Sequence, residues 1–538
     1  MSSIEPNPNI NNDYAKLGFG EIAPGQQGHR ELLLKQKIAK VALHIIVSLA
    51  IIFVAATVGL LLGGLPGAAI GAGIGIGIAA MGNTGFLVYR QVTAHKYNPP
   101  STSNMEFPKD VPSLGEFHGG NDLLVTKDGK ETTDWKLDLI DRAEQSIELC
   151  ASIGGGPTFR KALEKIEERI KQKGITAHIM TTPDLLEKKD IKLLKRLAKE
   201  YPENFRYCIT PLIPELLPDP HLIENHPKIL VVDEKYFTVG STNFQEELIQ
   251  PGQEKPEKRE GRKFIQSNIS SASREMDVIG KGLMAKTLRR EFYKLFAIWE
   301  YRTAPLKPKG LNNYYRPIDE KKQVASLDSL DRCEELIKNV KIKAVVSGPE
   351  NQFNNCTDEY VALIKGAKKN IKIGQMFFSP APEIVDALKE VPLDCEMTLI
   401  TNSKGKNGPP SGKFYVDANR LNYPLILNSD RSKNHVYEYQ VPDTVYHKKA
   451  LIVDGQRSII GSYNTGLKSH ECDYELTFTI DSEAVTKKVE EVLEADLEKD
   501  NIGKHKYVRE LSWQKVEKMS SAFKTRLFGN LQNQILLI

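Results

Sequence analysis

A doubled motif constrains this chain more than any other feature of its 538 residues. A His-x-Lys-x4-Asp pattern occurs twice, and its members are His226, Lys228, Asp233, His447, Lys449 and Asp454. Each copy continues through a turn and a short apolar stretch into Gly-Ser-x-Asn, which supplies Ser241, Asn243, Ser462 and Asn464. Two matches with the same continuation indicate a duplicated unit rather than a chance match.

The residues around both copies predict an α/β fold. Strands are expected at 146–153, 175–182 and 205–212, with amphipathic helices at 159–174 and 185–201 between them. The pattern at 139–149 returns at 363–373 with Leu, Ile and Ala at equal offsets. We therefore predict duplicated lobes, each a mixed sheet flanked by helices, related by pseudo-twofold symmetry and preceded by a transmembrane helical hairpin.

These patterns divide the chain into seven parts. They are a disordered, basic segment (1–40), a helical hairpin (41–89), a linker (90–121), a first lobe (122–303), a second linker (304–322), a second lobe (323–500) and a basic amphipathic tail (501–538).

The stretch between Lys40 and Arg90 contains no charged side chain. As a helix, residues 41–62 would extend about 33 Å, the thickness of a hydrocarbon core. A second span at 68–89 carries glycines at the spacing of closely packed membrane helices, namely Gly71, Gly75, Gly73 and Gly77. Basic residues flank both ends, so the positive-inside rule predicts a two-span membrane protein with its catalytic part in the cytosol.

The motif spacing suits phosphodiester chemistry. Residues two apart on a strand share a face, so each His and Lys point the same way, while Lys448 faces away and is expected to be expendable. Two facing lobes would present two imidazoles, two ammonium groups and two amides to one phosphate. One histidine could attack phosphorus while the other protonates the leaving alcohol, with Lys and Asn stabilising the equatorial oxygens. This chemistry needs no metal or other cofactor.

A nucleophilic histidine is usually held by a carboxylate on its other ring nitrogen. The second half offers Glu475, 11 residues after Asn464, and the first half offers Asp277, 34 residues after Asn243. Residues 250–270, rich in Pro, Gly and alternating charges, lengthen the sequence separation between Asn243 and the first-half carboxylate. We interpret them as a solvated insertion, with a substrate gate as the alternative.

The doubled motif resembles that of the phospholipase D superfamily over roughly residues 122–500. The resemblance implies two lobes, one shared active site and a covalent phosphohistidine intermediate, with His226 the nucleophile and His447 the acid. It implies phosphate binding by Lys228, Lys449, Asn243, Asn464, Ser241 and Ser462. Asp233 and Asp454 belong to the catalytic motif but are expected to fix the turn after the strand.

We therefore expect a membrane-anchored phosphodiesterase or transphosphatidylase that acts on glycerophospholipid head groups. The hydrophobic pair followed by two lobes resembles cardiolipin synthases, which is one alternative, although the first Gly-Ser-Thr-Asn departs from their frequent Gly-Gly-x-Asn. A membrane-tethered nuclease and a catalytically silent lipid-binding scaffold are the others. The net charge of only +4 and the lack of interleaved basic and aromatic residues disfavour a nucleic-acid partner.

Two further features leave alternatives open. The Gly-rich hairpin is similar to those of inclusion-membrane proteins of intracellular bacteria, which would make the chain a secreted effector on a host membrane. In the tail, apolar residues recur every four positions among basic ones, at Met519, Phe523, Leu527, Leu531 and Ile535. They predict either a helix on the membrane surface or a helix packed on the second lobe. The six cysteines are scattered and indicate neither a disulfide framework nor a zinc site.

Overall fold

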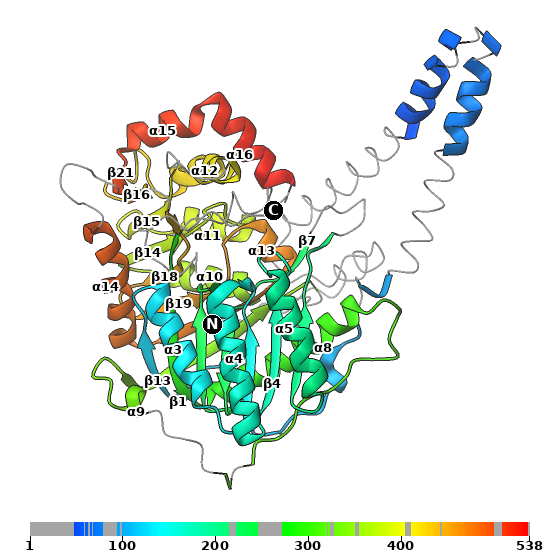
Figure 1. The fold of residues 1–538 in the computed structure, drawn as a ribbon. Helices are drawn as coiled ribbons and strands as arrows, with labels where there is room; N and C mark the ends of the chain where they lie inside the picture. The colour runs from blue at the N-terminus through cyan, green and yellow to red at the C-terminus, as the bar shows by residue number, and fades with distance from the viewer. Residues whose placement is uncertain are drawn as a thin grey trace, which may run out of the picture.

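A computed structural model of the chain shows a mixed α/β body with two apolar helical segments extending from it (Figure 1). The residues that the structure describes are 48–58, 60–62, 65–66, 68–78, 94–96, 99–214, 222–245, 272–319, 321–322, 328–349, 355–403, 410–441, 444–499 and 508–535. The predicted disordered segment 1–40 and the predicted insertion 250–270 lie outside these residues.

Strands of the first half follow the spatial order β5-β4-β2-β8-β9-β12-β1. Their bounds are β1 His118–Val125, β2 Ser146–Cys150, β4 Thr176–Thr181, β5 Phe205–Ile209, β8 Ile229–Val232, β9 Tyr236–Gly240 and β12 Asp277–Gly282. The three strands β2, β4 and β5 are parallel, and the other neighbours are antiparallel.

Strands of the second half follow the matching order β16-β15-β14-β18-β19-β20-β13, with the same directions. Their bounds are β13 Ile337–Ser347, β14 Asn370–Gln375, β15 Glu396–Asn402, β16 His435–Tyr439, β18 Lys449–Val453, β19 Arg457–Gly461 and β20 Asp473–Asp481. Strand β1 pairs with β13, so one large mixed sheet runs through both halves.

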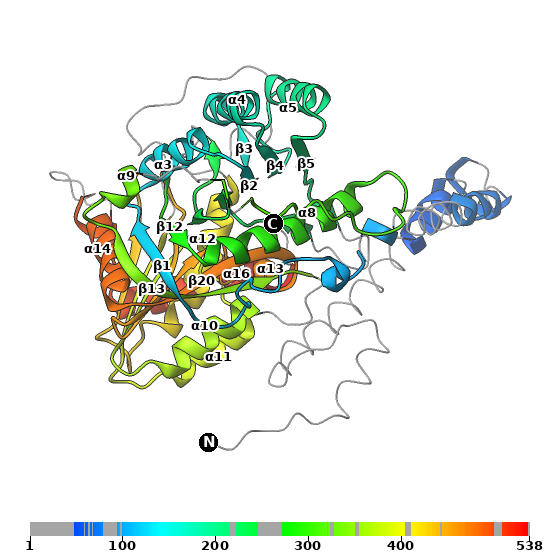
Figure 2. The same cartoon turned by 90° about the horizontal axis from the view of Figure 1, so that it is seen from below.

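Helices cover the outer faces of this sheet. Figure 2 shows α3, α4 and α5 on one side of the strands and α10 and α11 on the opposite side. The main helices are α3 Gly129–Asp141, α4 Gly156–Lys173, α5 Lys188–Glu200, α8 Met284–Thr303, α10 Asn355–Gly366, α11 Pro382–Glu390, α12 Pro410–Asn422 and α14 Glu483–Lys499. The elements predicted between residues 146 and 212 are confirmed, with ends that differ by a few residues.

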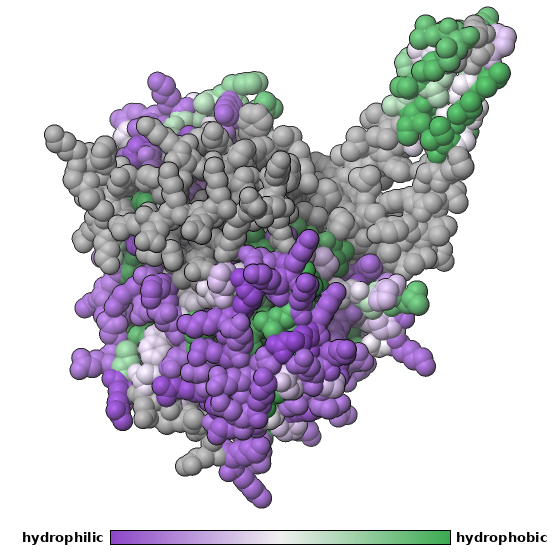
Figure 3. Space-filling view, in the orientation of Figure 1, coloured by the Kyte–Doolittle hydropathy of each residue, from purple (hydrophilic) through white to green (hydrophobic). Residues whose placement is uncertain are grey.

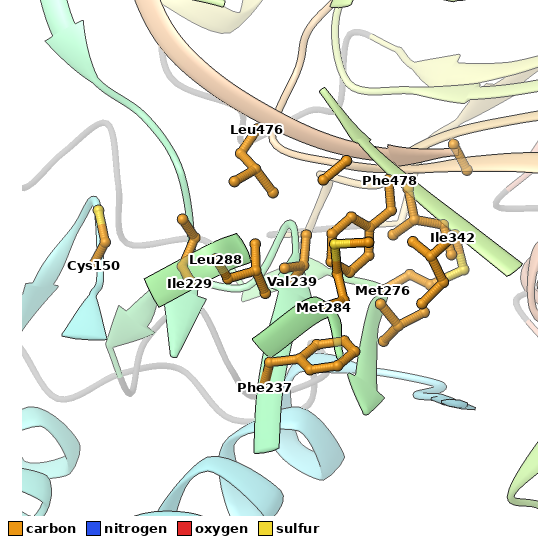
Figure 4. Packing of buried hydrophobic residues seen from close by; sticks show 14 of the residues in the cluster. Cys150, Ile229, Phe237, Val239, Met276, Met284, Leu288, Ile342, Leu476 and Phe478 are labelled. Atoms are coloured by element: carbon orange, nitrogen blue, oxygen red, sulfur yellow. The ribbon is translucent and has the colours of Figure 1, made fainter. Parts of the chain in front are cut away.

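A shared hydrophobic core joins the two halves. Phe237 of β9 meets Phe478 of β20 edge-on, with ring centroids 5.7 Å apart. Figure 4 shows them in a cluster to which both halves contribute buried side chains, among them Val239, Leu476 and Ile342. Each half also has a cluster of its own beneath its outer helices. Burying the shared cluster stabilises the two halves against one another, at roughly 25 cal/mol per Å² of apolar surface.

The two motif aspartates bind the same backbone feature in each half. Asp233 accepts hydrogen bonds from the N–H groups of residues 144–146, at 2.7–2.9 Å. Asp454 accepts from those of residues 368–370, at 2.7–3.1 Å. Each carboxylate thus ties the end of β8 or β18 to the start of the neighbouring strand β2 or β14. Both residues have positive φ, 54° and 55°. These contacts fit the expected structural role of the two aspartates.

The two apolar helical segments pack through glycine. A Cβ atom added at Gly71 would lie 2.2 Å from the Ala55 carbonyl oxygen, and one at Gly75 would lie 2.8 Å from the Ile52 Cα. The same atom at Gly73 or Gly77 would meet nothing within 4 Å. The two helical segments therefore approach one another closely at Gly71 and Gly75, which are one of the two predicted glycine pairs.

Within the described residues, no helix combines the length and the apolar character needed to cross a membrane. The two segments predicted as spans, 41–62 and 68–89, lie partly outside those residues. Two predicted boundaries also shift. Strand β1 begins at His118, inside the predicted linker, and the predicted tail contains a strand, β21 Val508–Glu510, that pairs with β16.

Replacing Asp454 by Ala should lower the free energy of unfolding by about 2 kcal/mol or more, because three backbone donors lose a charged acceptor. Burial alone would raise the pKa of Asp454, but the three N–H bonds outweigh it and hold this pKa below its ordinary value. The contribution is therefore complete at neutral pH and is lost only as pH falls through that lowered pKa. Chemical denaturation at pH 7 measures it, with Asp394→Ala, at an exposed position, as control. Equal stabilities of the two variants would contradict the expectation.

Candidate active site

Two short strand pairings exchange segments between the halves beside the motif histidines. Strand β7 (Leu222–Asn225) of the first half pairs in parallel with the start of β20. Strand β11 (Ala272–Arg274) of the first half pairs in parallel with β17 (Thr444–Tyr446) of the second. The backbone N–H of His226 then donates to Tyr474 O at 3.2 Å, and that of His447 donates to Arg274 O at 3.0 Å. Each histidine is therefore fixed at a junction between the halves.

Each histidine ring is held by a glutamate from the opposite half. His226 Nδ1 lies 3.0 and 2.9 Å from the two carboxylate oxygens of Glu475. His447 Nδ1 lies 2.8 Å from Glu275 Oε2. Burial raises the pKa of each glutamate, but the histidine and lysine beside it outweigh burial, so both pKa values lie below the ordinary one. Ionised glutamates accept hydrogen bonds, so Nδ1 carries the proton and Nε2 keeps its lone pair.

The predicted histidine-orienting pair needs correction. Asp277 does not contact a motif histidine; its Oδ1 accepts from the backbone N–H of Thr242 at 3.2 Å. Glu275, two residues earlier, takes the role, and it serves the second-half His447. Glu475 does orient a histidine, but the one it orients is His226 of the first half. The prediction assumed that each half supplies its own carboxylate, whereas the parallel pairings exchange them.

A repeat-based signal for Glu275 is present in the sequence. Glu275 follows Asn243 by 32 residues and Glu475 follows Asn464 by 11, and the difference of 21 equals the length of segment 250–270. Strand registers agree, because Asp277 pairs with Gly240 as Thr477 pairs with Gly461. Asp277 thus corresponds to Thr477, and Glu275 corresponds to Glu475.

Both motif lysines are buried next to their own histidine. Lys228 Nζ donates to His226 O at 2.7 Å, and Lys449 Nζ donates to His447 O at 2.9 Å. Burial lowers the pKa of Lys228. Burial, together with the nearby Lys228, lowers the pKa of Lys449 to about 7. The two ammonium groups repel one another, and a bound anion would offset this repulsion.

The asparagines and serines of Gly-Ser-x-Asn differ in what they contact. Asn243 Oδ1 accepts from Ile153 N at 3.3 Å, and the Oδ1 atom of Asn464 is buried and has no hydrogen-bond partner among the described residues. Ser462 Oγ donates to Glu475 and accepts from Leu476 N. Ser241 bonds the backbone of Met276 in the same manner. The serine hydroxyls therefore support the glutamate-bearing strands, whereas they were expected to bind phosphate.

The two histidines differ in their surroundings. Burial lowers the pKa of both, and that of His447 falls to about 4. The carboxylates of Glu475 and Glu224 favour the charged form of His226, and Lys228 opposes it. Glu275 favours the charged form of His447, and Lys449 and Lys228 oppose it. Both rings are therefore neutral at pH 7 in the free protein.

A cluster of carboxylates next to His226 includes a lysine, Lys468. Ligand atoms of His226, Asp473 and Glu475 lie within 4.8 Å of one another, a spacing that could hold a metal ion. The ammonium group of Lys468 pairs with Glu224 and lies 2.8 Å from Asp473 Oδ1. Nδ1 of His226 is already bonded to Glu475. Lys468 thus supplies a cation to two of these carboxylates from within the protein.

Lys448 faces away from the histidine and lysine of its motif, as predicted, but it is not a free surface residue. Its side chain is fully buried and pairs with Asp496 of α14. Asp496 also bonds Arg274, which pairs opposite Tyr446 in the exchanged strands. Removing the lysine would leave a buried carboxylate with one partner fewer, so the expectation that Lys448 is expendable is wrong.

Comparisons with known proteins agree with this geometry. Residues 360–497, which include the second motif, match the family model described as "Cardiolipin synthase, PLD-like domain". These residues, about a quarter of the chain, are therefore similar to the PLD-like domain of that family.

Individual relatives carry the same name. A cardiolipin synthase of Clostridium perfringens is 24% identical over 384 residues, 70% of each chain. Cardiolipin synthase 2 of Bacillus cereus is 29% identical over 180 residues, 33% of each chain. Among solved structures, phosphatidylserine synthase of Haemophilus influenzae is similar over 77% of this chain and 94% of its own, with 11% identity and a TM-score of 0.49.

Replacing Glu275 by Gln should lower turnover of a phosphodiester such as bis(p-nitrophenyl) phosphate about 10²-fold or more, because His447 loses the carboxylate that fixes its tautomer. Asp277→Asn, the matched control two residues away, should change turnover by no more than a few-fold. Steady-state kinetics on both variants tests the assignment. A larger loss in Asp277→Asn than in Glu275→Gln would contradict it.

Affinity for a phosphodiester anion should weaken as pH rises above about 7, because Lys449 loses its proton there. The loss should reach about tenfold per pH unit if this charge dominates binding. Lys449→Arg should flatten the dependence, since a guanidinium stays charged. Competitive inhibition by diethyl phosphate between pH 6 and 9 measures it, with exposed Lys389→Arg as control. A wild-type affinity independent of pH would refute the expectation.

Proposed function

We propose that this protein is a membrane-associated transphosphatidylase that exchanges glycerophospholipid head groups through a phosphohistidine intermediate. One observation carries the proposal: His226 and His447, each oriented at Nδ1 by a glutamate of the opposite half, are each followed two residues later by a buried lysine. The matching strand orders of the two halves support the proposal that they are duplicated lobes sharing one active site.

The proposed reaction uses only groups of this chain. Nε2 of one histidine attacks phosphorus, and the bond to the head-group oxygen breaks while the other histidine protonates that oxygen. An acceptor hydroxyl then gives its proton to the second histidine and attacks the phosphohistidine, which restores the first. Lys228 and Lys449, with the amides of Asn243 and Asn464, bind the non-bridging oxygens.

Neutral histidines suit the attacking role in the free protein. The acid must be protonated once substrate is bound, and the negative charge of a bound phosphodiester raises the pKa of a neighbouring imidazole. Glutamate at Nδ1 stabilises the imidazolium that forms. Burial of both lysines keeps the phosphate site in a low-dielectric surrounding, where each charge-assisted hydrogen bond is stronger than in water.

Cardiolipin synthesis is the member of this class that the relatives favour. Cardiolipin consists of two phosphatidyl groups joined by one glycerol, so the acceptor would be a hydroxyl of phosphatidylglycerol and the leaving alcohol would be glycerol. Water as acceptor would instead give phosphatidic acid. Because this substrate is a membrane lipid, the proposal places the protein at a membrane. The proposal involves no nucleic-acid partner.

The full chain in vesicles of phosphatidylglycerol should release glycerol and form cardiolipin, and both products should fall about 10³-fold or more in His226→Ala and His447→Ala. Acid quenching with phosphate-labelled donor should leave label on histidine in the wild type. Cleavage of single-stranded DNA without lipid turnover would favour the nuclease. Vesicle binding by His226→Ala with no turnover by any form would favour the scaffold.

Phosphatidyl-p-nitrophenol separates the two histidine roles, because its leaving group needs no acid. The variant that lacks only the acid should still form the labelled enzyme and accumulate it, since the same group activates the acceptor. We expect this of His447→Ala, with the label on His226. Label on His447 in the His226→Ala variant would reverse the two roles.

A further inference from the structure

The C-terminal helices α15 (Trp513–Ser521) and α16 (Phe523–Ile535) form the upper edge of the α/β body in Figure 1, where they pack on α12. On α16 the packed face contains Thr525, which is 4% exposed, and Gly529. A Cβ atom at Gly529 would lie 3.0 Å from the Asp417 carbonyl oxygen of α12. One face of α16 is therefore packed against the rest of the protein.

At its start, the opposite face of α16 presents two apolar side chains to solvent. Phe523 is 80% exposed and Leu527 is 48% exposed. They are four residues apart, so they share a face, and the 100° advance per residue places that face opposite Thr525 and Gly529. This arrangement inverts the usual amphipathic helix of a soluble protein, whose apolar side chains lie on the packed face.

Cationic side chains flank the exposed apolar pair. The 100° advance places Lys524 on one side of Phe523 and Leu527, and Arg526 on the other, and both are exposed. Between Val508 and Ile535 the chain has five basic and two acidic side chains. An apolar strip between cations matches an anionic lipid surface, where the rings enter the boundary region and the cations reach phosphate.

Other apolar surface lies on the same side of the molecule. Figure 3 shows green residues at the top edge, where Figure 1 places α15 and α16, and over the N-terminal helical segments at the upper right. Those segments also expose large apolar side chains, including Phe53, Leu61 and Leu62. The lower part of this face of the body is mainly hydrophilic (Figure 3).

We propose that the outward face of α16, formed by Phe523, Lys524, Arg526 and Leu527, docks on the surface of a bilayer that contains anionic phospholipid. The helix lies in the interface plane, with the two apolar side chains about 5–10 Å into the boundary between head groups and acyl chains. This contact is separate from any anchoring by the N-terminal segments and does not depend on the proposed catalysis.

The docked helix is linked to the candidate active site through α12. Asn419 of α12 accepts from the backbone N–H of Phe378 at 2.7 Å. Tyr415, also in α12, stacks on Phe377 with ring centroids 4.1 Å apart. This loop follows Gln375 of β14, which pairs directly with Lys449. Docking of α16 would therefore orient the second-half motif relative to the lipid surface.

Depth-dependent quenching in the full chain tests the docking. A dye that senses polarity is attached to Phe523→Cys, in a Cys333→Ser background because the other five cysteines are buried. The matched control is Leu393→Cys, an apolar position that is 67% exposed in the turn after α11. Vesicles of phosphatidylcholine and phosphatidylglycerol carry lipids with a quencher at the upper acyl chain.

The expected result is a blue shift and loss of fluorescence at position 523 and neither at position 393. Both effects should diminish when phosphatidylcholine replaces phosphatidylglycerol, and in the Lys524→Glu, Arg526→Glu double variant. No quenching at 523, or equal quenching at 523 and 393, would overturn the proposal. Turnover of a short-chain, monomeric phospholipid is measured in parallel: its absence would refute the proposed function, whereas quenching alone decides the docking.

Discussion

The exchanged histidine–glutamate pairs are the interaction on which the rest of this structure depends. Each pair joins a ring from one half to a carboxylate from the other, at 2.8–3.0 Å. A buried ionised glutamate without its partner would cost several kcal/mol, so neither half can move away from the other without leaving buried charges unpaired. The candidate catalytic groups and the junction between the halves are therefore made of the same residues.

The hydrophobic contacts around these pairs explain how the geometry is held. The shared core places β9 and β12 against β19 and β20, and these are the strands that bring the Gly-Ser-x-Asn ends and the glutamates to one place. Packing at interior density leaves little freedom for one sheet to slide over the other. Ser241 and Ser462 add local support, because their hydroxyls bond the strands that carry Glu275 and Glu475.

Much of the fold could be predicted from periodicity, because strand and helix signals at 146–212 are local. The candidate His and Lys residues could also be found, because the motif occurs twice with the same continuation. His226, Lys228 and His447 nevertheless lie just before strands β8 and β18, outside the strands on which they were expected. Their carboxylate partners could not be placed in this way. Which half supplies a glutamate depends on the long-range pairings β7 with β20 and β11 with β17, which leave no periodic signal.

Lys448 shows a different limit of sequence reasoning. The expected alternation of side chains correctly predicted that Lys448 points away from His447 and Lys449. Alternation does not show whether such a side chain reaches solvent or packs against another buried element. Helix α14 covers that side and supplies Asp496. The tail shows a similar limit: the four-residue apolar spacing predicted a helix, while packing on α12 decided which of its faces remained outside.

The exchange of glutamates also has a consequence for how the chain is made. Synthesis proceeds from the N-terminus, so His226 leaves the ribosome 249 residues before Glu475, the residue that fixes its tautomer. His447 and Glu275 are likewise separated by 172 residues. A nascent chain that has completed only its first half has neither histidine correctly held. The candidate active site is thus incomplete until nearly the whole protein has been translated and its two halves have met.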